Sequence, residues 1–135
     1  MNKRSIIFVV FACLMTIFSF NGKTIAEVNH LGFEKYPDNS QKEFESVNNF
    51  YEEVPPKDYV EFENAKLNIR KKVGFKDVNK ILSKVDKYGK ARIDGDGIHP
   101  KRQMYVFITI SENEEHEKIA VFDAETKQKM FGIEE

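Results

Sequence analysis

Lysines at helical spacing are the residues of this 135-residue chain best suited to binding chemistry. On a helical wheel they fall within about 80° of one another, opposite an apolar arc. These residues are Lys76, Lys80, Lys84 and Lys87. Four ammonium groups on one exposed face attract anionic polymers or anionic lipid head groups. Other basic residues could extend this patch if the fold brings them near, namely Arg70, Lys71, Lys72, Lys90 and Arg92. A solvated helix face with no binding role has the same pattern, so both interpretations stay open.

Two other polar groups are similar to cation sites but lack the full set of ligands. Asp94-Gly95-Asp96-Gly97 begins like a calcium loop, yet Ile98 and Tyr105 occupy the positions of a third oxygen ligand and the closing glutamate. The second group crowds a predicted hairpin tip and consists of Glu112, Glu114, Glu115, His116 and Glu117. Such residues hold a hard cation weakly, and more commonly they keep a loop soluble. The sequence therefore predicts no metal site.

Residues arranged for catalysis are sparse. The three histidines, His30, His99 and His116, have no motif neighbours. No zinc-binding histidine pair, nucleophilic serine elbow or phosphate-binding glycine loop is present. Carboxylates are plentiful, but acid–base catalysis requires them to converge in a cleft, which spacing alone does not show. We therefore expect a protein that is not an enzyme and uses no cofactor.

The first 26 residues have the three-part layout of a secretory signal peptide. Lys3 and Arg4 precede an apolar run at 6–20, and a cut is expected after Ala26. Because this run is shorter than the roughly 20 residues that span a bilayer, cleavage is favoured over retention as an uncleaved anchor. Lipid modification of Cys13 is a weaker alternative. The protein is thus expected to be secreted or extracytoplasmic.

The expected mature chain, 27–135, has the length of one small domain and contains no cysteine, so disulfides and thiol chemistry are not expected in it. Its charge is segregated along the chain. Residues 27–65 include ten acidic and three basic residues, 66–92 ten basic and two acidic, and 93–135 ten acidic and five basic. Nucleic acid is not an expected partner, because the chain is predicted to be exported, is acidic overall and lacks aromatic–basic interleaving.

The elements expected in this domain are helices followed by strands. An irregular stretch at 27–39 precedes a capping box at Ser40–Glu43. The predicted elements are helices at 41–53, 58–73 and 75–88 and strands at 90–94, 104–111, 118–123 and 128–133. The fold class is therefore α+β, with N-terminal helices followed by an antiparallel β-meander packed on an amphipathic helix. Aromatic residues expected in the core are Phe44, Phe50, Tyr51, Tyr59 and Phe62.

The C-terminal half, 75–133, resembles a PepSY-type domain in its order of one helix and three strands. The turn Asp123-Ala124-Glu125-Thr126-Lys127 is similar to the Asp-Ala-x-Thr-Gly turn of that family, with Lys127 in place of the usual glycine. As a second choice, 73–86 resembles small exported lipoprotein and β-lactamase-inhibitor-protein-like domains, without their glycine and proline. Both resemblances imply non-catalytic extracytoplasmic modules that bind proteins or peptides, and neither implies catalytic residues.

These observations predict an exported, non-catalytic module that binds or inhibits a protein or peptide in the cell envelope or outside it. The alternative is electrostatic attachment of the lysine stripe to an anionic envelope polymer or lipid surface. An unrecognised hydrolase is the third hypothesis. Any other contact with a membrane is expected only through a retained signal segment.

Overall fold

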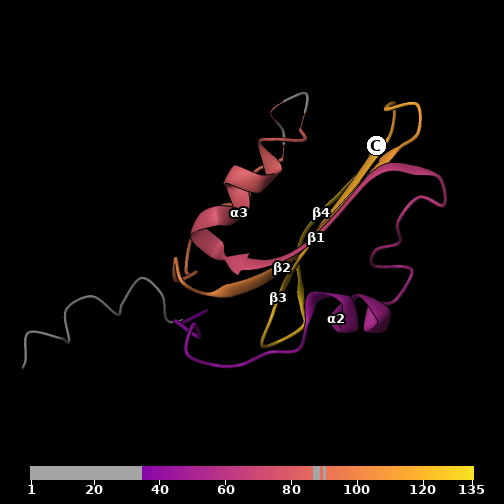
Figure 1. Cartoon of the computed structure of the whole chain (residues 1–135). Helices are drawn as coiled ribbons and strands as arrows, with labels where there is room; N and C mark the ends of the chain where they lie inside the picture. Colours follow the sequence, from indigo (N-terminus) through magenta and orange to yellow (C-terminus); the bar gives the residue numbers. More distant parts are fainter. Residues whose placement is uncertain (1–34, 87–88, 90) are drawn as a thin grey trace, which may run out of the picture. The chain divides into compact units, whose positions relative to one another are not determined.

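The computed structural model describes residues 35–86, 89 and 91–135, so the predicted signal segment and residues 27–34 lie outside the described residues. One antiparallel sheet contains four strands in chain order: β1 (Ala65–Gly74), β2 (Gln103–Ser111), β3 (Glu117–Asp123) and β4 (Lys129–Glu134). Two helices accompany it, α2 (Val47–Glu53) and α3 (Phe75–Leu82) (Figure 1). The predicted α+β class is confirmed for this part of the chain.

The two helices lie on opposite faces of the sheet (Figure 1). Side chains of β2 alternate between the faces, with Val106 in the cluster under α3 and Phe107 in the cluster under α2. Strand β2 is buried almost throughout because both of its faces are covered. Its continuous apolar sequence predicted this central position, and strands β2, β3 and β4 are confirmed within one residue of the expected bounds.

Helix α3 begins where expected but is shorter than predicted. Val78 and Leu82 are fully buried against the sheet, which explains the apolar arc of the sequence. The helix ends at Leu82, and a turn follows in which Val85 N–H donates to the carbonyl of Leu82. The predicted helix extended to residue 88, of which residues 87 and 88 lie outside the described residues.

The segment predicted as a helix at 58–73 is wrong over its second half, where the chain forms strand β1. Ile69 pairs with Ile108 and Val73 pairs with Met104, so the apolar residues of β1 pack in register with those of β2. The apolar spacing fits a helix and a strand about equally, and pairing with β2 decides between them. Asp58 caps no helix; its N–H donates to the carbonyl of Pro55 in a turn.

The first predicted helix is also shorter than expected and begins at Val47. Its N-cap is Ser46, whose hydroxyl accepts from Asn49 N–H at 3.2 Å. Ser40 lies in an earlier turn, where its N–H donates to the carboxylate of Asp38 at 2.8 Å. The predicted strand at 90–94 does not form over the described residues 91–94.

The expected aromatic core lies between α2 and the sheet. The ring of Phe50 stacks on Tyr105 with centroids 4.3 Å apart, and Tyr59 stacks on Phe107 at 5.5 Å. Phe44 and Tyr51 are partly buried against the same cluster, whereas Phe62 is half-buried outside it. The prediction is thus confirmed most clearly for Phe50 and Tyr59, which are buried.

Candidate binding face

Alternation along β1 divides the basic segment of the chain between two faces of the sheet. Ile69 and Val73 pack in the cluster on the α3 side. Lys71, midway between them, therefore projects to the same side, while Arg70 and Lys72 project to the α2 side. Because α3 begins directly after Gly74, Lys71 lies on the face of the sheet over which the helix continues.

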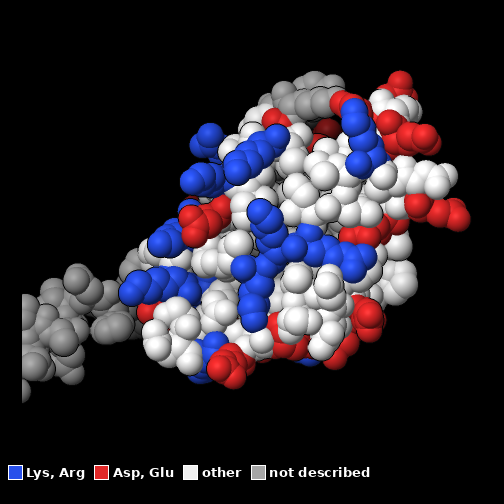
Figure 2. Space-filling model, viewed as in Figure 1, with Lys and Arg blue, Asp and Glu red and all other residues white. Residues whose placement is uncertain are grey.

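Four exposed lysines follow one another on this side of the protein, and we call them the basic face. They are Lys71 on β1, Lys76 and Lys80 on α3, and Lys84 in the turn after α3. None of the four has an ion pair within the described part of the chain. Figure 2 shows basic side chains gathered over α3 and β1. Lys87, the fourth lysine of the predicted stripe, lies outside the described residues.

The two basic residues on the other side of β1 serve the structure. Arg70 donates from Nε and Nη2 to the carboxylate of Glu61, each at 2.7 Å, and its guanidinium lies 3.6 Å from the ring centroid of Tyr51. The hydrogen bonds to Glu61 raise the pKa of Arg70. Lys72 donates from Nζ to the carbonyls of Phe44 and Glu45. Both side chains fasten the α2 layer to the sheet and are not part of the basic face.

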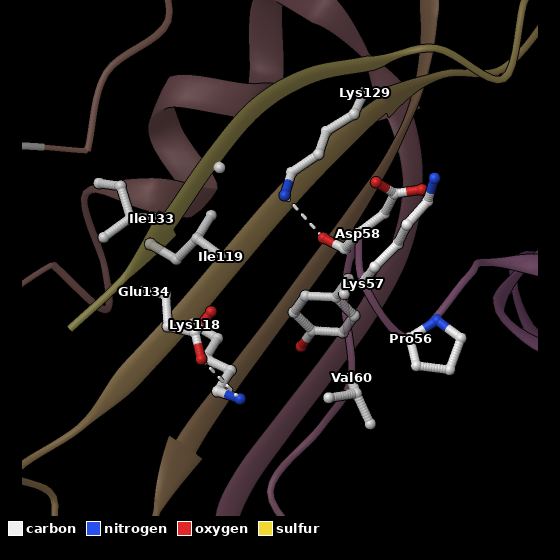
Figure 3. Close-up of a pocket in the computed structure, with 11 residues that line it drawn as sticks. Pro56, Lys57, Asp58, Val60, Lys118, Ile119, Lys129, Ile133 and Glu134 are labelled. Atoms are coloured by element: carbon white, nitrogen blue, oxygen red, sulfur yellow. Dashed lines mark hydrogen bonds and ion pairs between the residues drawn. The ribbon is translucent and has the colours of Figure 1, made fainter.

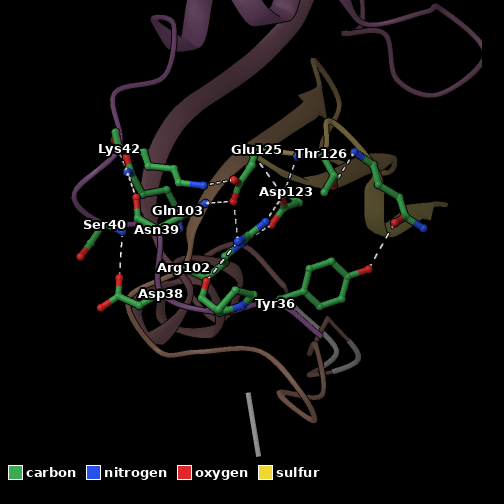
Figure 4. Close-up of polar contacts among 12 residues, drawn as sticks. Tyr36, Asp38, Asn39, Ser40, Lys42, Arg102, Gln103, Asp123, Glu125 and Thr126 are labelled. Carbon is green, nitrogen blue, oxygen red and sulfur yellow. Dashed lines mark hydrogen bonds and ion pairs between the residues drawn. The ribbon is translucent and has the colours of Figure 1, made fainter. Parts of the chain in front are cut away.

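A polar cluster at the start of β2 and the β3–β4 turn surrounds a buried ion pair (Figure 4). Arg102 donates from Nε and Nη2 to the two carboxylate oxygens of Asp123 at 2.7 and 2.8 Å. Asp123 Oδ1 also accepts the N–H groups of Glu125 and Thr126. Burial by itself raises the pKa of Asp123, but the bonds from Arg102 and Thr126 outweigh burial and hold the pKa below its ordinary value.

This cluster also anchors the beginning of the described chain. Arg102 Nη1 donates to the carbonyl of Pro37 at 3.1 Å and pairs with Glu125 at 2.6 Å. Asn39 accepts from Gln103 N–H at 2.7 Å, and Lys42 pairs with Glu125. These bonds fasten residues 37–42 to the start of β2 and to the β3–β4 turn. A structural role therefore accounts for the polar residues of this cluster.

The β3–β4 turn contains a lysine in a backbone conformation that favours glycine. Lys127 has φ 59°, at the position where PepSY-type turns usually have glycine. Its ammonium group pairs with Glu45 at 2.8 Å and Glu53 at 2.6 Å, bonds that raise the pKa of Lys127. The side chain thus connects the turn to the α2 layer at the cost of backbone strain.

Because Lys127 has a positive φ, we expect a glycine at this position to be more stable than an alanine. Lys127→Ala removes the ion pairs and keeps the strained conformation, whereas Lys127→Gly removes both. We expect the glycine variant to be more stable than the alanine variant by about 1 kcal/mol, measured by urea unfolding. Equal stability of the two variants would show that the positive φ carries no cost.

A pocket of about 210 Å³ lies between the 56–60 segment and strands β3 and β4 (Figure 3). Two of its lysines are engaged: Lys118 pairs with Glu134 at 2.9 Å, and Lys129 donates to the carbonyl of Asp58 at 2.6 Å. The Tyr59 hydroxyl is buried without a hydrogen-bond partner among the described residues, and burial raises the pKa of Tyr59. The lining of this pocket mixes lysines with Asp58 and Glu134, so the pocket does not present charge of one sign as the basic face does.

The remaining polar groups of the sequence lie on turns. Residues 112–116 connect β2 to β3, and there Glu114 pairs with Lys66. The Asp94-Gly95-Asp96-Gly97 stretch contains a turn in which Gly97 has φ 74°. Within the residues described, no group of three or more His, Cys, Asp or Glu side chains is arranged to hold a metal ion. No helix in the described ranges is long and apolar enough to cross a membrane.

Comparison with known proteins finds no match. No protein-family model matches the chain, and neither the curated proteins nor the solved structures contain a significant match to it. The resemblance to PepSY-type domains and the other proposed families accordingly stays a prediction.

Proposed function

We propose that this protein is a non-catalytic binding module that acts outside the cytoplasmic membrane and holds an acidic protein or peptide against its basic face. The observation that supports this proposal is the set of four exposed lysines without ion pairs, Lys71, Lys76, Lys80 and Lys84. Arg102 and Lys127, by contrast, are neutralised by carboxylates. Unpaired ammonium groups are available to an anionic partner without breaking an existing bond.

Export of the module rests on the layout of its first 26 residues. On this proposal the mature chain begins at Glu27, which mass spectrometry of protein from the culture fluid can test. A chain that retains Met1 among cytosolic proteins would contradict export. That result would leave the binding chemistry of the basic face unaffected, because it depends only on 71–84.

A second candidate function is attachment to an anionic envelope polymer or lipid surface. The favouring observation is the spacing of Lys76, Lys80 and Lys84, exposed at every fourth position on and just after α3. Vesicles with and without anionic lipid separate this function from protein binding. Retention on anionic vesicles, with no binding of acidic polypeptides, would favour attachment over the leading proposal.

Charge reversal of the basic face is expected to abolish partner binding. The variant carries Lys71→Glu, Lys76→Glu, Lys80→Glu and Lys84→Glu. Since these side chains are exposed, we expect each substitution to change the free energy of unfolding by no more than about 0.5 kcal/mol. Pull-down from envelope and culture-fluid extracts should recover a specific acidic protein with the wild type and lose it with this variant.

Two controls separate charge at this face from charge in general. Arginine at the same four positions keeps the charge and should keep binding. Lys35→Glu with Lys57→Glu places negative charge on exposed residues outside the basic face and should leave binding within about twofold of wild type. Recovery of the same partners by the four-glutamate variant would contradict the proposed function.

A further inference from the structure

We propose that the free edge of β1 accepts an extended acidic peptide segment as a fifth strand of the sheet. This inference rests on the proposed function and deepens it, since it names the form of the partner and how it is held. Addition of a strand to a sheet edge uses main-chain hydrogen bonds for affinity and side chains for specificity.

The outward-facing groups of β1 follow from its pairing. Strand β1 lies at one end of the sheet order and pairs only with β2 (Figure 1). In an antiparallel pair, alternate residues direct both N–H and C=O to the partner strand. Phe75, the residue after β1, donates its N–H to the carbonyl of Arg102 in the register that β1 and β2 share. By alternation from Phe75, the odd-numbered residues of β1 direct their main-chain N–H and C=O groups toward β2. The main-chain groups of Asn68, Arg70 and Lys72 therefore face away from the sheet.

These outward groups have no main-chain partner among the described residues. The open edge is long, because β1 has 10 residues while β4, at the other edge, has 6. A register shift between Ala65 and Leu67 ends the regular part of the edge on one side, and α3 ends it on the other. The edge between these two points is long enough to pair with a short extended segment.

Charge selects the occupant of this edge. Strand β1 has four basic residues and no acidic one: Lys66, Arg70, Lys71 and Lys72. Lys66 and Arg70 pair with Glu114 and Glu61, but Lys71 and Lys72 have no carboxylate partner in the described part of the chain. A second copy paired edge to edge would place these two like charges against their counterparts, which is unfavourable. A segment with glutamate at alternate positions carries all its carboxylates on one face, and on the α3 side of the sheet they can meet Lys71.

An apolar contact at the end of the edge adds to this selection. Leu67 is 41% exposed, an unusual degree for a large apolar side chain of this fold. It lies with Ile110 in a shallow depression of about 290 Å³. An extended acidic segment with an apolar side chain near one end would cover Leu67 as it pairs with Asn68 and Arg70.

Amide hydrogen exchange, followed by NMR, tests strand addition directly. The probe is a capped ten-residue peptide in which glutamate alternates with threonine and valine. We expect the amides of Asn68, Arg70 and Lys72 to exchange about tenfold more slowly when the peptide is bound. The amides of Ile69 and Lys71, which already face β2, should change little. The same peptide with lysine in place of glutamate should not bind.

A matched pair of variants provides a second readout. Asn68→Pro removes one outward N–H at an edge position that tolerates proline, and Asn68→Ala removes only the side chain. We expect peptide affinity to fall about tenfold in the proline variant and less than about twofold in the alanine variant. Circular dichroism and the exchange pattern of β2 and β3 check that the sheet remains intact.

The outcomes distinguish this inference from the proposed function. Peptide binding that depends on the basic face, with no new protection at Asn68, Arg70 and Lys72, would overturn strand addition and leave the proposed function intact. Absence of peptide binding would contradict strand addition, while the pull-down with the four-glutamate variant decides the proposed function separately. The three amides could instead become protected without peptide, and increasingly so at higher protein concentration. That result would identify a second copy of the chain as the occupant and would overturn the proposal that an acidic segment pairs with this edge.

Discussion

Arg102→Ala is expected to destabilise the protein by about 3–5 kcal/mol, because it leaves a buried carboxylate without its counter-ion. Arg102 is 3% exposed and its partner Asp123 is 0% exposed. The two N–H groups of Glu125 and Thr126 remain on Asp123, but the guanidinium that also binds Pro37 is lost. Urea unfolding followed by far-UV circular dichroism measures the change in the free energy of unfolding.

The Arg70–Glu61 pair is a matched control for burial. It has the same two-bond geometry at 2.7 Å, but its side chains are 30% and 11% exposed. We expect Arg70→Ala to cost only about 1–2 kcal/mol, including the lost stacking on Tyr51. Equal costs for the two alanine variants would contradict the role assigned to burial of Arg102 and Asp123.

Acid provides a second check on this prediction. Because the pKa of Asp123 is lower in the folded chain than in the unfolded chain, its stabilisation is present above the unfolded value of about 4. It is lost as the pH falls through the lower folded value. The difference in stability between wild type and Arg102→Ala should therefore narrow below about pH 4. A difference that stays constant from neutral pH to pH 2 would exclude the ion pair as its source.

Phe107→Ala is expected to have a similarly large effect, about 3–5 kcal/mol, because it opens a cavity in the aromatic core. Phe107 is 0% exposed. Its ring centroid lies 5.5 Å from those of Tyr51 and Tyr59, 5.8 Å from Phe122 and 6.0 Å from Phe50. Thermal and urea unfolding measure the loss of stability. In amide exchange, the amides of α2 should lose more protection than those of α3.

Phe62→Ala serves as the control for aromatic content. Phe62 is half-buried and lies outside the aromatic cluster, with Lys118 Nζ 4.8 Å from its ring centroid. Its removal should cost no more than about 1.5 kcal/mol. A comparable loss in both variants would contradict the assignment of Phe107 to the centre of the core.

The parts of the fold that could be predicted are those whose local sequence allows one structure. The β-branched and aromatic residues at 104–111 are apolar on both faces, which only a central strand satisfies at that length. The apolar arc at 75–85 has helical spacing and little strand character, so α3 was also predictable. The turn at Asp123 was predictable because aspartate side chains often accept hydrogen bonds from the backbone just after them. Here Asp123 accepts the N–H groups of Glu125 and Thr126.

Strand β1 could not be predicted with the same security, since its structure is decided by a partner distant in sequence. Its apolar residues include Ile69 and Val73, whose spacing of four suits a helix, while Leu67 and Ile69 alternate as in a strand. Pairing with β2 resolves the choice. The helix start at Ser40 failed for a related reason: Asp38 and Asn39 hold that segment in a turn bonded to Gln103.

The same ambiguity limited prediction of the candidate site. The exposure of Lys76, Lys80 and Lys84 followed from the wheel of α3 and agrees with the structure. Lys71 was expected only as one of several basic residues that could extend the stripe. A helix at 58–73 gives no indication that Lys71 lies between two inward-facing residues of a strand. The alternation of Leu67, Ile69, Lys71 and Val73 was the signal that would have placed it there, along with the open edge beside it.

Binding of poly-L-glutamate measured by titration across a range of salt is the most direct test of the proposed role of the basic face. We expect the wild type to bind, with an affinity that falls at least about tenfold between roughly 0.05 and 0.5 M sodium chloride, because exposed charges are screened. The variant with glutamate at 71, 76, 80 and 84 should show no binding at any salt concentration. Salt-independent binding by the wild type, or equal binding by the variant, would show that the basic face does not hold an acidic partner by charge.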